Sequence, residues 1–232
     1  MAEKIVGILG GMGPEATVDL FAKIVGATPA STDQEHLHII VDNNSKIPSR
    51  QAKLLGSGED PTPLLQATAR NLERAGAGFI VIPCNTAHLF FDRIVEAVHV
   101  PVLHIADETV EEVLRRFPEV RTVGVLASTA TTRLRLYHDK LEAQGLIAIS
   151  PAEADQEILQ SVIFSVKAGD KGPAVREKIR GVAERLAAEG AQVLLTACTE
   201  LPLVLQDGQA SVPVVDPTQA LAVAAVRFAR GS

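Results

Sequence analysis

Short apolar runs alternate with longer amphipathic segments along almost the whole chain. The runs are rich in Val, Ile and Leu, show little apolar–polar alternation, and end in Gly, Pro or polar residues. Strands of this kind are typical of parallel sheets with both faces covered by crossover helices. We expect strands at 4–9, 38–42, 79–82, 102–104, 122–126, 193–196 and 214–215. We expect helices at 14–25, 63–75, 87–97, 107–116, 132–144, 155–167, 173–189 and 217–229. The pattern therefore predicts an α/β fold.

Three sequence matches indicate an internal duplication. Val-Gly-Ile-Leu at 6–9 matches Val-Gly-Val-Leu at 123–126, Gly-Ala at 76–77 matches 190–191, and Val-Pro-Val at 100–102 matches 212–214. The pairs keep their order and nearly the same offset, and each Gly-Ala precedes a strand and a cysteine. The alternative is chance, since such strings are common in parallel α/β proteins.

Composition and charge exclude several classes of function. The net charge is −6 and the longest basic run is the pair at 115–116, so we expect no nucleic-acid partner. No apolar stretch reaches the roughly 18–20 uncharged residues of a membrane helix, so we expect no membrane partner. The N-terminal segment lacks a signal-peptide layout, which favours a cytoplasmic location. Two cysteines are too few for a disulfide scaffold or a four-ligand zinc site, so we expect free thiols.

Each cysteine directly follows an expected strand and precedes helix-like sequence. Cys84 lies in Pro-Cys-Asn-Thr-Ala-His and Cys198 in Ala-Cys-Thr-Glu-Leu. Ligands of parallel sheets bind beyond the carboxyl ends of the strands, where both thiols are expected. A thiol at a helix start also favours the thiolate form. A lone cysteine is more often buried and inert. A second cysteine at the same point of the repeat instead favours a pair of thiols that act from two sides.

The residues beside the cysteines are suited to ligand binding. Asn85 and Thr86 can orient a polar ligand or cap the helix, and Thr199 loosely mirrors Thr86. Glu200 can tune Cys198 or its proton supply. Its alternative role is that of a first-turn acidic residue stabilised by the helix dipole.

Two further segments are candidate anion sites. Gly11, Met12 and Gly13 follow the first strand, and such a turn presents backbone N–H groups at a helix start. Its spacing fits neither a dinucleotide fingerprint nor a P-loop. The loop at 42–50 is rich in Asn and Ser and ends in Arg50, which is suited to bidentate carboxylate binding. The alternatives are an unliganded tight turn and a solvated arginine. Lys167 ends a helix-like run, and the simpler reading is a lysine that faces the helix dipole.

Taken together, these motifs resemble the aspartate/glutamate racemase superfamily, and within it the aspartate racemase branch. The matching segments are Gly-Gly-Met-Gly-Pro at 10–14, Asp-Asn-Asn with Ile-Pro-x-Arg at 42–50, Pro-Cys-Asn-Thr-Ala-His at 83–88 and Cys-Thr-Glu-Leu at 198–201. Glutamate racemases typically carry His after Cys-Thr, whereas this chain has Glu200, which favours aspartate.

The resemblance implies two pseudo-symmetric α/β lobes, each a parallel sheet flanked by helices, with the active site in the cleft between them. We place the first lobe at 1–104 plus a returning C-terminal helix at 217–232, and the second at 105–216. The resemblance also implies a homodimer and a racemase that uses neither pyridoxal phosphate nor a metal. Cys84 and Cys198 then form the acid/base pair, and Arg50 and Lys167 bind substrate.

Other functions remain open at this point. On the same scaffold they are glutamate or broad-specificity racemisation, and a related cysteine isomerase or decarboxylase. From a different class, the chain would be an amino-acid binding module with inert thiols. A redox role has less support because there is no Cys-x-x-Cys.

Overall fold

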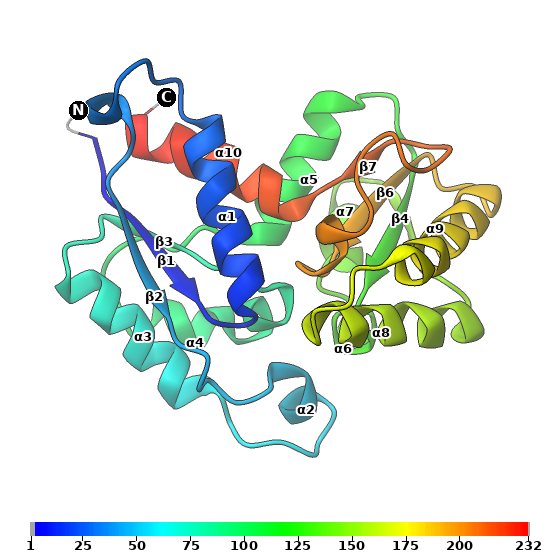
Figure 1. Ribbon diagram of the computed structural model, residues 1–232, viewed down its shortest axis with the longest axis horizontal. Coiled ribbons are helices and arrows are strands. Elements are labelled where there is room, and N and C mark those ends of the chain that lie inside the picture. Colours follow the sequence, from blue (N-terminus) through cyan, green and yellow to red (C-terminus); the bar gives the residue numbers. More distant parts are fainter. Residues whose placement is uncertain (1–2, 232) are drawn as a thin grey trace. The chain divides into compact units, whose positions relative to one another are not determined.

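The computed structural model describes residues 3–231, which divide into two compact α/β units (Figure 1). The first unit runs to Glu108 and resumes at Thr218, and the second is Thr109–Pro217. Helix α5 (Ile105–Arg116) contains the first change of unit, and the second lies at the start of α10 (Pro217–Arg230).

The first unit is built on a three-stranded parallel sheet in the order β2-β1-β3. Its strands are β1 (Val6–Gly10), β2 (Ile39–Asn43) and β3 (Phe79–Val81). Its other elements are α1 (Pro14–Ala27), η1 (Asp33–Glu35), α2 (Arg50–Leu54), α3 (Thr62–Arg74), η2 (Asn85–Phe90) and α4 (Phe91–Val95). An isolated bridge from Ile80 to Val102 extends the sheet beyond β3.

Side chains alternate between two cores on the faces of this sheet. Phe79 and Val81 pack with α1 and the returning helix α10. Ile80 and Ile82 pack on the other face with α3 and α4 (Figure 1). Because both faces are covered, the central strand β1 is buried throughout, which explains its continuous apolar sequence.

The second unit repeats this arrangement with a four-stranded parallel sheet in the order β5-β4-β6-β7. Its strands are β4 (Thr122–Ala127), β5 (Ile147–Ile149), β6 (Val193–Ala197) and β7 (Val214–Val215). Its other elements are α6 (Thr129–Arg133), α7 (His138–Ala143), α8 (Glu153–Lys167), α9 (Pro173–Ala188) and η3 (Leu201–Leu203). Helices α8 and α9 cover one face of this sheet and share a core with Leu126 and Leu194. Within residues 3–231, none of the helices has the length and apolar character needed to span a bilayer.

The internal repeat has a common packing contact in the two units. A Cβ built on Gly7 would lie 2.8 Å from the Cβ of Ala77, and one on Gly124 would lie 2.9 Å from that of Ala191. Each central strand, β1 or β4, therefore carries a glycine at the point where the segment that leads into the neighbouring strand, β3 or β6, comes close to it. The backbone N–H groups of Ile80 and Leu194 donate to Pro101 O and Pro213 O, both at 2.9 Å. All three sequence matches thus fall at equivalent places in the two sheets.

Three expected elements are wrong or incomplete, and one strand was missed. The expected helix 87–97 is a 3-10 helix, η2, followed by the short helix α4. The expected helix 132–144 is divided into α6 and α7, because Arg135 adopts a left-handed φ of 56° between them. The expected strand 102–104 is reduced to one bridge, since the carbonyl of His104 already accepts from the N–H of Asp107 at the start of α5. Strand β5 was not expected, because its three residues are partly exposed at a sheet edge.

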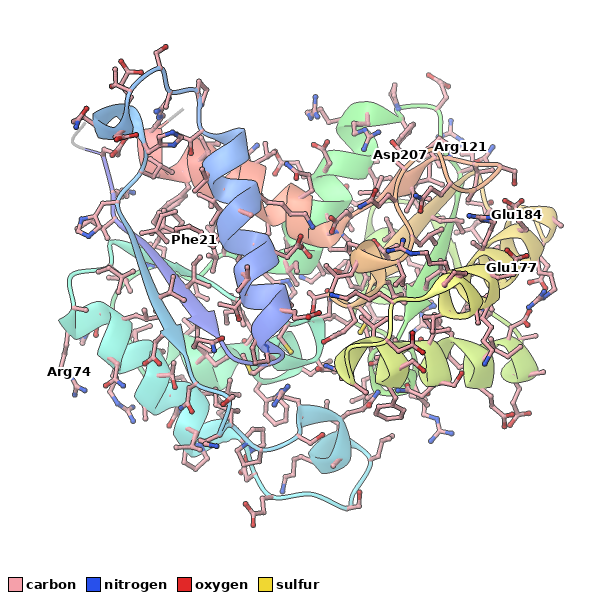
Figure 2. All side chains as sticks on the ribbon, in the orientation of Figure 1. Phe21, Arg74, Arg121, Glu177, Glu184 and Asp207 are labelled. Atoms are coloured by element: carbon pink, nitrogen blue, oxygen red, sulfur yellow. The ribbon has the colours of Figure 1, made fainter. Side chains whose placement is uncertain are left out.

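Two carboxylates fix the segment that leads into β7, and both are labelled in Figure 2. Asp207 accepts from the N–H of Val214 at 2.9 Å and from Arg116 Nη2 at 3.0 Å, while Glu184 accepts from the N–H of Ser211 at 2.9 Å. The backbone N–H of Val214, together with the Arg116 guanidinium, lowers the pKa of Asp207. This irregular segment is therefore held by charge-assisted hydrogen bonds in place of a longer strand.

Gly124→Ala tests the close strand–helix approach. The new Cβ would meet Leu194 Cδ2 at 2.7 Å and Leu186 Cδ2 at 2.9 Å, so we expect a loss of about 1–3 kcal/mol in the free energy of unfolding. Denaturant unfolding measures this loss. Gly26→Ala in α1 is the matched control, because its Cβ meets nothing within 4 Å and we expect a gain of up to about 1 kcal/mol. Equal effects of the two substitutions would contradict this account of the packing.

Candidate active site

The two cysteines occupy equivalent turns at the carboxyl ends of β3 and β6. Each thiol is free and buried, with Cys84 4 % and Cys198 9 % exposed. The carbonyl of Cys84 accepts from the N–H of Ala87 at 3.2 Å, and the carbonyl of Cys198 accepts from the N–H of Leu201 at 2.9 Å. A 3-10 turn therefore follows each thiol, and the repeat extends from the sheets to the cysteines themselves.

The residues that follow Cys84 in the sequence are polar but uncharged. Its Sγ lies 3.4 Å from Thr86 Oγ1, and the side chain of Asn85 is buried beside it. The helix that begins here is η2, a 3-10 helix of six residues, so the macrodipole of a long α-helix does not start at this thiol. The expected helix-dipole effect on Cys84 is therefore weaker than the sequence indicated.

His88 fixes the turn of Cys84 from within the core. Its Nδ1 lies 2.9 Å from the carbonyl oxygen of Cys84, and its Nε2 accepts from the N–H of Ile105 at 3.1 Å. Burial, with the nearby His104 ring, lowers the pKa of His88 to about 3. His88 is thus a neutral imidazole at physiological pH. The role of His88 was not predicted from the sequence, although its position four residues after Cys84 was a signal.

The glycine turn after β1 approaches the neighbouring loop backbone to backbone. A Cβ on Gly11, whose φ is +92°, would lie 2.3 Å from the carbonyl carbon of Asn44, so only glycine is accommodated there. Thr17 of α1 holds the turn: its Oγ1 accepts from the N–H of Gly11 at 2.9 Å and donates to Gly13 O at 3.2 Å. Sequence reasoning missed Thr17, which lies one helical turn after Gly13.

Arg50 is fixed by backbone carbonyls. Its Nη1 donates to Ile47 O at 3.1 Å and Pro48 O at 2.8 Å, and its Nη2 donates to Met12 O at 3.3 Å. The buried Nε–H has no hydrogen-bond acceptor among the described residues. Within residues 3–231 this guanidinium forms no ion pair with a carboxylate, so its positive charge stays available to a ligand.

A shared apolar cluster joins these elements of the first unit. Met12 from the glycine turn, Ile47 from the Arg50 loop and Cys84 belong to one buried cluster with Leu9 and Ile82. The structure therefore brings together four of the predicted features of this unit: the glycine turn, Arg50, Cys84 and its neighbours Asn85 and Thr86.

Cys198 in the second unit lies in a charged environment. Its Sγ–H donates to Glu200 Oε2 at 3.0 Å, and Glu200 Oε1 forms an ion pair with Lys167 at the end of α8. Glu200 is buried and the Lys167 side chain is partly exposed. Burial and the carboxylate of Glu200 raise the pKa of Cys198 well above its usual range.

Lys167, Glu200 and Cys198 therefore form one connected group, and Thr199 is buried beside it. Lys167 is engaged with a protein carboxylate in this state. Its ammonium is paired with Glu200, and Glu200 in turn accepts the hydrogen bond of the Cys198 thiol. Within the described chain, no group of three or more His, Cys, Asp and Glu side chains is arranged to hold a metal ion.

Comparison with known proteins identifies the family of the chain. Residues 9–225 match the family model of Asp/Glu/Hydantoin racemase. A broad-specificity amino-acid racemase of Bacillus subtilis is 28% identical over 226 residues, which cover 96% of each chain.

Solved structures share the fold. An aspartate racemase of Picrophilus torridus is 32% identical with a TM-score of 0.87, over 98% of this chain and 94% of the other. An aspartate racemase homologue of Pyrococcus horikoshii is 29% identical with a TM-score of 0.78, over 98% and 99%. A glutamate racemase of Bacillus anthracis, 15% identical over 99% and 82%, shows the same fold with a TM-score of 0.69. The chain belongs to the Asp/Glu/Hydantoin racemase family and is an isomerase of that family.

Proposed function

We propose that this protein is a cofactor-independent amino-acid racemase that acts on aspartate through Cys84 and Cys198. The observation that carries the proposal is the repeat: each half ends an equivalent strand with a free, buried thiol in an equivalent turn. Inversion at an α-carbon needs a base on one face and an acid on the other, and two thiols supply both.

In this scheme, one thiolate removes the α-proton and becomes a thiol, and the electron pair stays on the substrate as a carbanion. The other thiol delivers its proton to the opposite face and becomes a thiolate. The two cysteines have then exchanged protonation states, and the reverse reaction uses them in the opposite roles. The scheme requires the two thiols to face one α-carbon during turnover.

Glu200 assigns the starting roles within this scheme. Its carboxylate accepts a hydrogen bond from the Cys198 thiol at 3.0 Å and forms an ion pair with Lys167. Cys198 therefore begins the cycle as the proton donor and Cys84 as the base. Ionisation of Cys198 later in the cycle is costly next to Glu200, so its reprotonation is favoured.

Arg50 and the glycine turn are proposed to bind the two carboxylates of aspartate. The guanidinium is fixed by three carbonyls yet keeps its buried Nε–H for a ligand, which suits the distal carboxylate. The turn at Gly11–Gly13 precedes α1, and because the N–H of Gly11 already donates to Thr17, we assign the N–H groups of Met12 and Gly13 to the α-carboxylate, where charge develops on deprotonation. The aspartate racemase of Picrophilus torridus supports this substrate, and the Bacillus subtilis relative supports broad specificity as the second candidate.

Cys84→Ser and Cys198→Ser test the two-thiol scheme. Each variant should lose inversion of aspartate by about a thousandfold or more, because serine is far too weak an acid and base for this step. Chiral chromatography of L- and D-aspartate, without added cofactor, measures the loss. A single variant that keeps wild-type turnover would contradict the scheme.

Arg50→Ala tests the distal carboxylate site. Loss of a charge-assisted, bidentate partner should raise KM for aspartate by roughly tenfold to a hundredfold. The matched control is Arg74→Ala on α3, an exposed arginine hydrogen-bonded to Asn71 (Figure 2), which should leave KM unchanged. An unchanged KM for the Arg50 variant would show that this loop binds no substrate.

Glu200→Gln tests the starting state of Cys198. Removal of the negative charge should lower the pKa of this thiol and speed its alkylation by iodoacetamide at pH 8 by on the order of tenfold. Peptide mass spectrometry follows Cys198, with Cys84 in the same chain as the internal control. If the alkylation rate of Cys198 stays the same or falls, Glu200 does not hold its proton.

A further inference from the structure

The side chain of His88 links the Cys84 turn to the start of α5 in the first unit. It is 3 % exposed, and both ring nitrogens have partners from the backbone of residues 84 and 105. Its ring lies edge-on to His104, with centroids 4.8 Å apart, and is stacked on Phe91 at 6.0 Å. The imidazole is therefore held on all sides, and it holds the Cys84 carbonyl in turn.

The hydrogen bonds fix one tautomer. The Cys84 carbonyl accepts only, so Nδ1 carries the proton, and the Ile105 N–H donates only, so Nε2 carries the lone pair. The imidazole satisfies both groups only when it is neutral. Protonation would bury a charge and place a hydrogen on Nε2 against the N–H of Ile105. The carbonyls of Cys84 and Leu103 favour the protonated ring, but the effect of burial on the pKa is larger.

The bond to Ile105 connects the thiol turn to the start of α5. Ile105 is the first residue of that helix, and its N–H is one of the helix donors that have no intrahelical acceptor. His88 supplies the acceptor. A displacement of the imidazole would therefore leave a buried carbonyl and a buried N–H less satisfied, each beside an element of the site.

The second half of the repeat holds its thiol differently. Pro202 stands at the position that corresponds to His88, four residues after the cysteine, and it has no side-chain donor. Cys198 is instead restrained through its own sulfur by Glu200. The two thiols thus lie in equivalent turns but are held differently. His88 holds the backbone carbonyl of Cys84, and Glu200 holds the sulfur of Cys198.

We propose that His88 is a positioning residue for Cys84, holding that thiol in place through the hydrogen bond to the Cys84 carbonyl. The inference rests on the proposed two-thiol reaction. It assigns His88 to only one of the two proton transfers, the one made by Cys84, whereas a residue that only stabilised the fold would affect both.

Two substitutions separate the two hydrogen bonds of the imidazole. His88→Asn keeps a donor near the position of Nδ1 and loses the acceptor for Ile105. His88→Gln places an amide near the position of Nε2 and loses the donor for Cys84. Each variant removes one buried hydrogen bond, so the two serve as matched controls for a loss of stability.

The readout is α-proton exchange and inversion of each aspartate enantiomer in D₂O, followed by NMR and chiral chromatography. Inversion needs both thiols, whereas exchange without inversion needs only the thiol that faces the proton. Cys84→Ser identifies the enantiomer that still exchanges through Cys198. For that enantiomer, the ratio of exchange to inversion should rise about tenfold or more in His88→Gln and stay near the wild-type value in His88→Asn.

A second measurement is independent of activity. Cys84 is 4 % exposed in its fixed turn, so loosening of the turn in His88→Gln should speed iodoacetamide alkylation of Cys84 relative to Cys198. His88→Asn should retain the wild-type ratio of the two alkylation rates.

Three results would overturn the inference. The first is a ratio of exchange to inversion that is unchanged in His88→Gln. The second is a ratio that changes equally in both variants. The third is loss of the folded state in both variants, which would show that His88 serves overall stability alone. If the wild-type protein itself neither exchanges nor inverts aspartate, the proposed function fails. The alkylation ratios then still decide whether His88 holds the Cys84 turn.

Discussion

Parallel pairing around one central strand in each unit determines where all the candidate site residues lie. β1 pairs with β2 and β3, and β4 pairs with β5 and β6, always in the same direction, so the loops that follow these strands gather at one edge of each sheet. This register depends on Gly7 and Gly124, because a larger side chain would push the next segment away from the sheet. The positions of the glycine turn, the Arg50 loop and the cysteine turns all depend on this parallel register.

Within this common frame, the two thiols differ in their electrostatics. Cys84 has a neutral neighbourhood of Thr86, Asn85 and the uncharged imidazole of His88. Cys198 donates to a buried carboxylate that is balanced by a lysine. A racemase with two identical thiols would have no preferred starting state. In the proposed mechanism, the difference between the two halves makes one cysteine the resting proton donor and leaves the other to act as base.

The sequence predicted the parts of the structure that depend on local pattern. Helices α1, α8 and α9 have clear apolar periodicity and end near the predicted residues. Fully buried strands such as β4 were equally clear. The cysteine turns, the glycine turn and Arg50 were also identified, because each follows a recognisable strand.

The missed features depend on contacts distant in sequence or on single backbone angles. The apolar pattern runs on through Arg135, so the break between α6 and α7 left no periodic signal. The hydrogen bond from the N–H of Ile105 to His88 and the ion pair of Lys167 with Glu200 join separate segments, and the sequence does not show which residues a loop brings together. Thr17 was hidden as an ordinary helix residue.

The central claim is that two thiols act on opposite faces of one α-carbon. The most direct measurement starts from protonated L-aspartate in D₂O and follows the isotope at the α-carbon of both enantiomers during the first turnovers. Our account predicts that newly formed D-aspartate carries deuterium while the remaining L-aspartate keeps its proton, since a different thiol makes each transfer. If D-aspartate forms with the original proton retained, or if L-aspartate gains deuterium as fast as D-aspartate appears, a single base serves both faces and the account is contradicted.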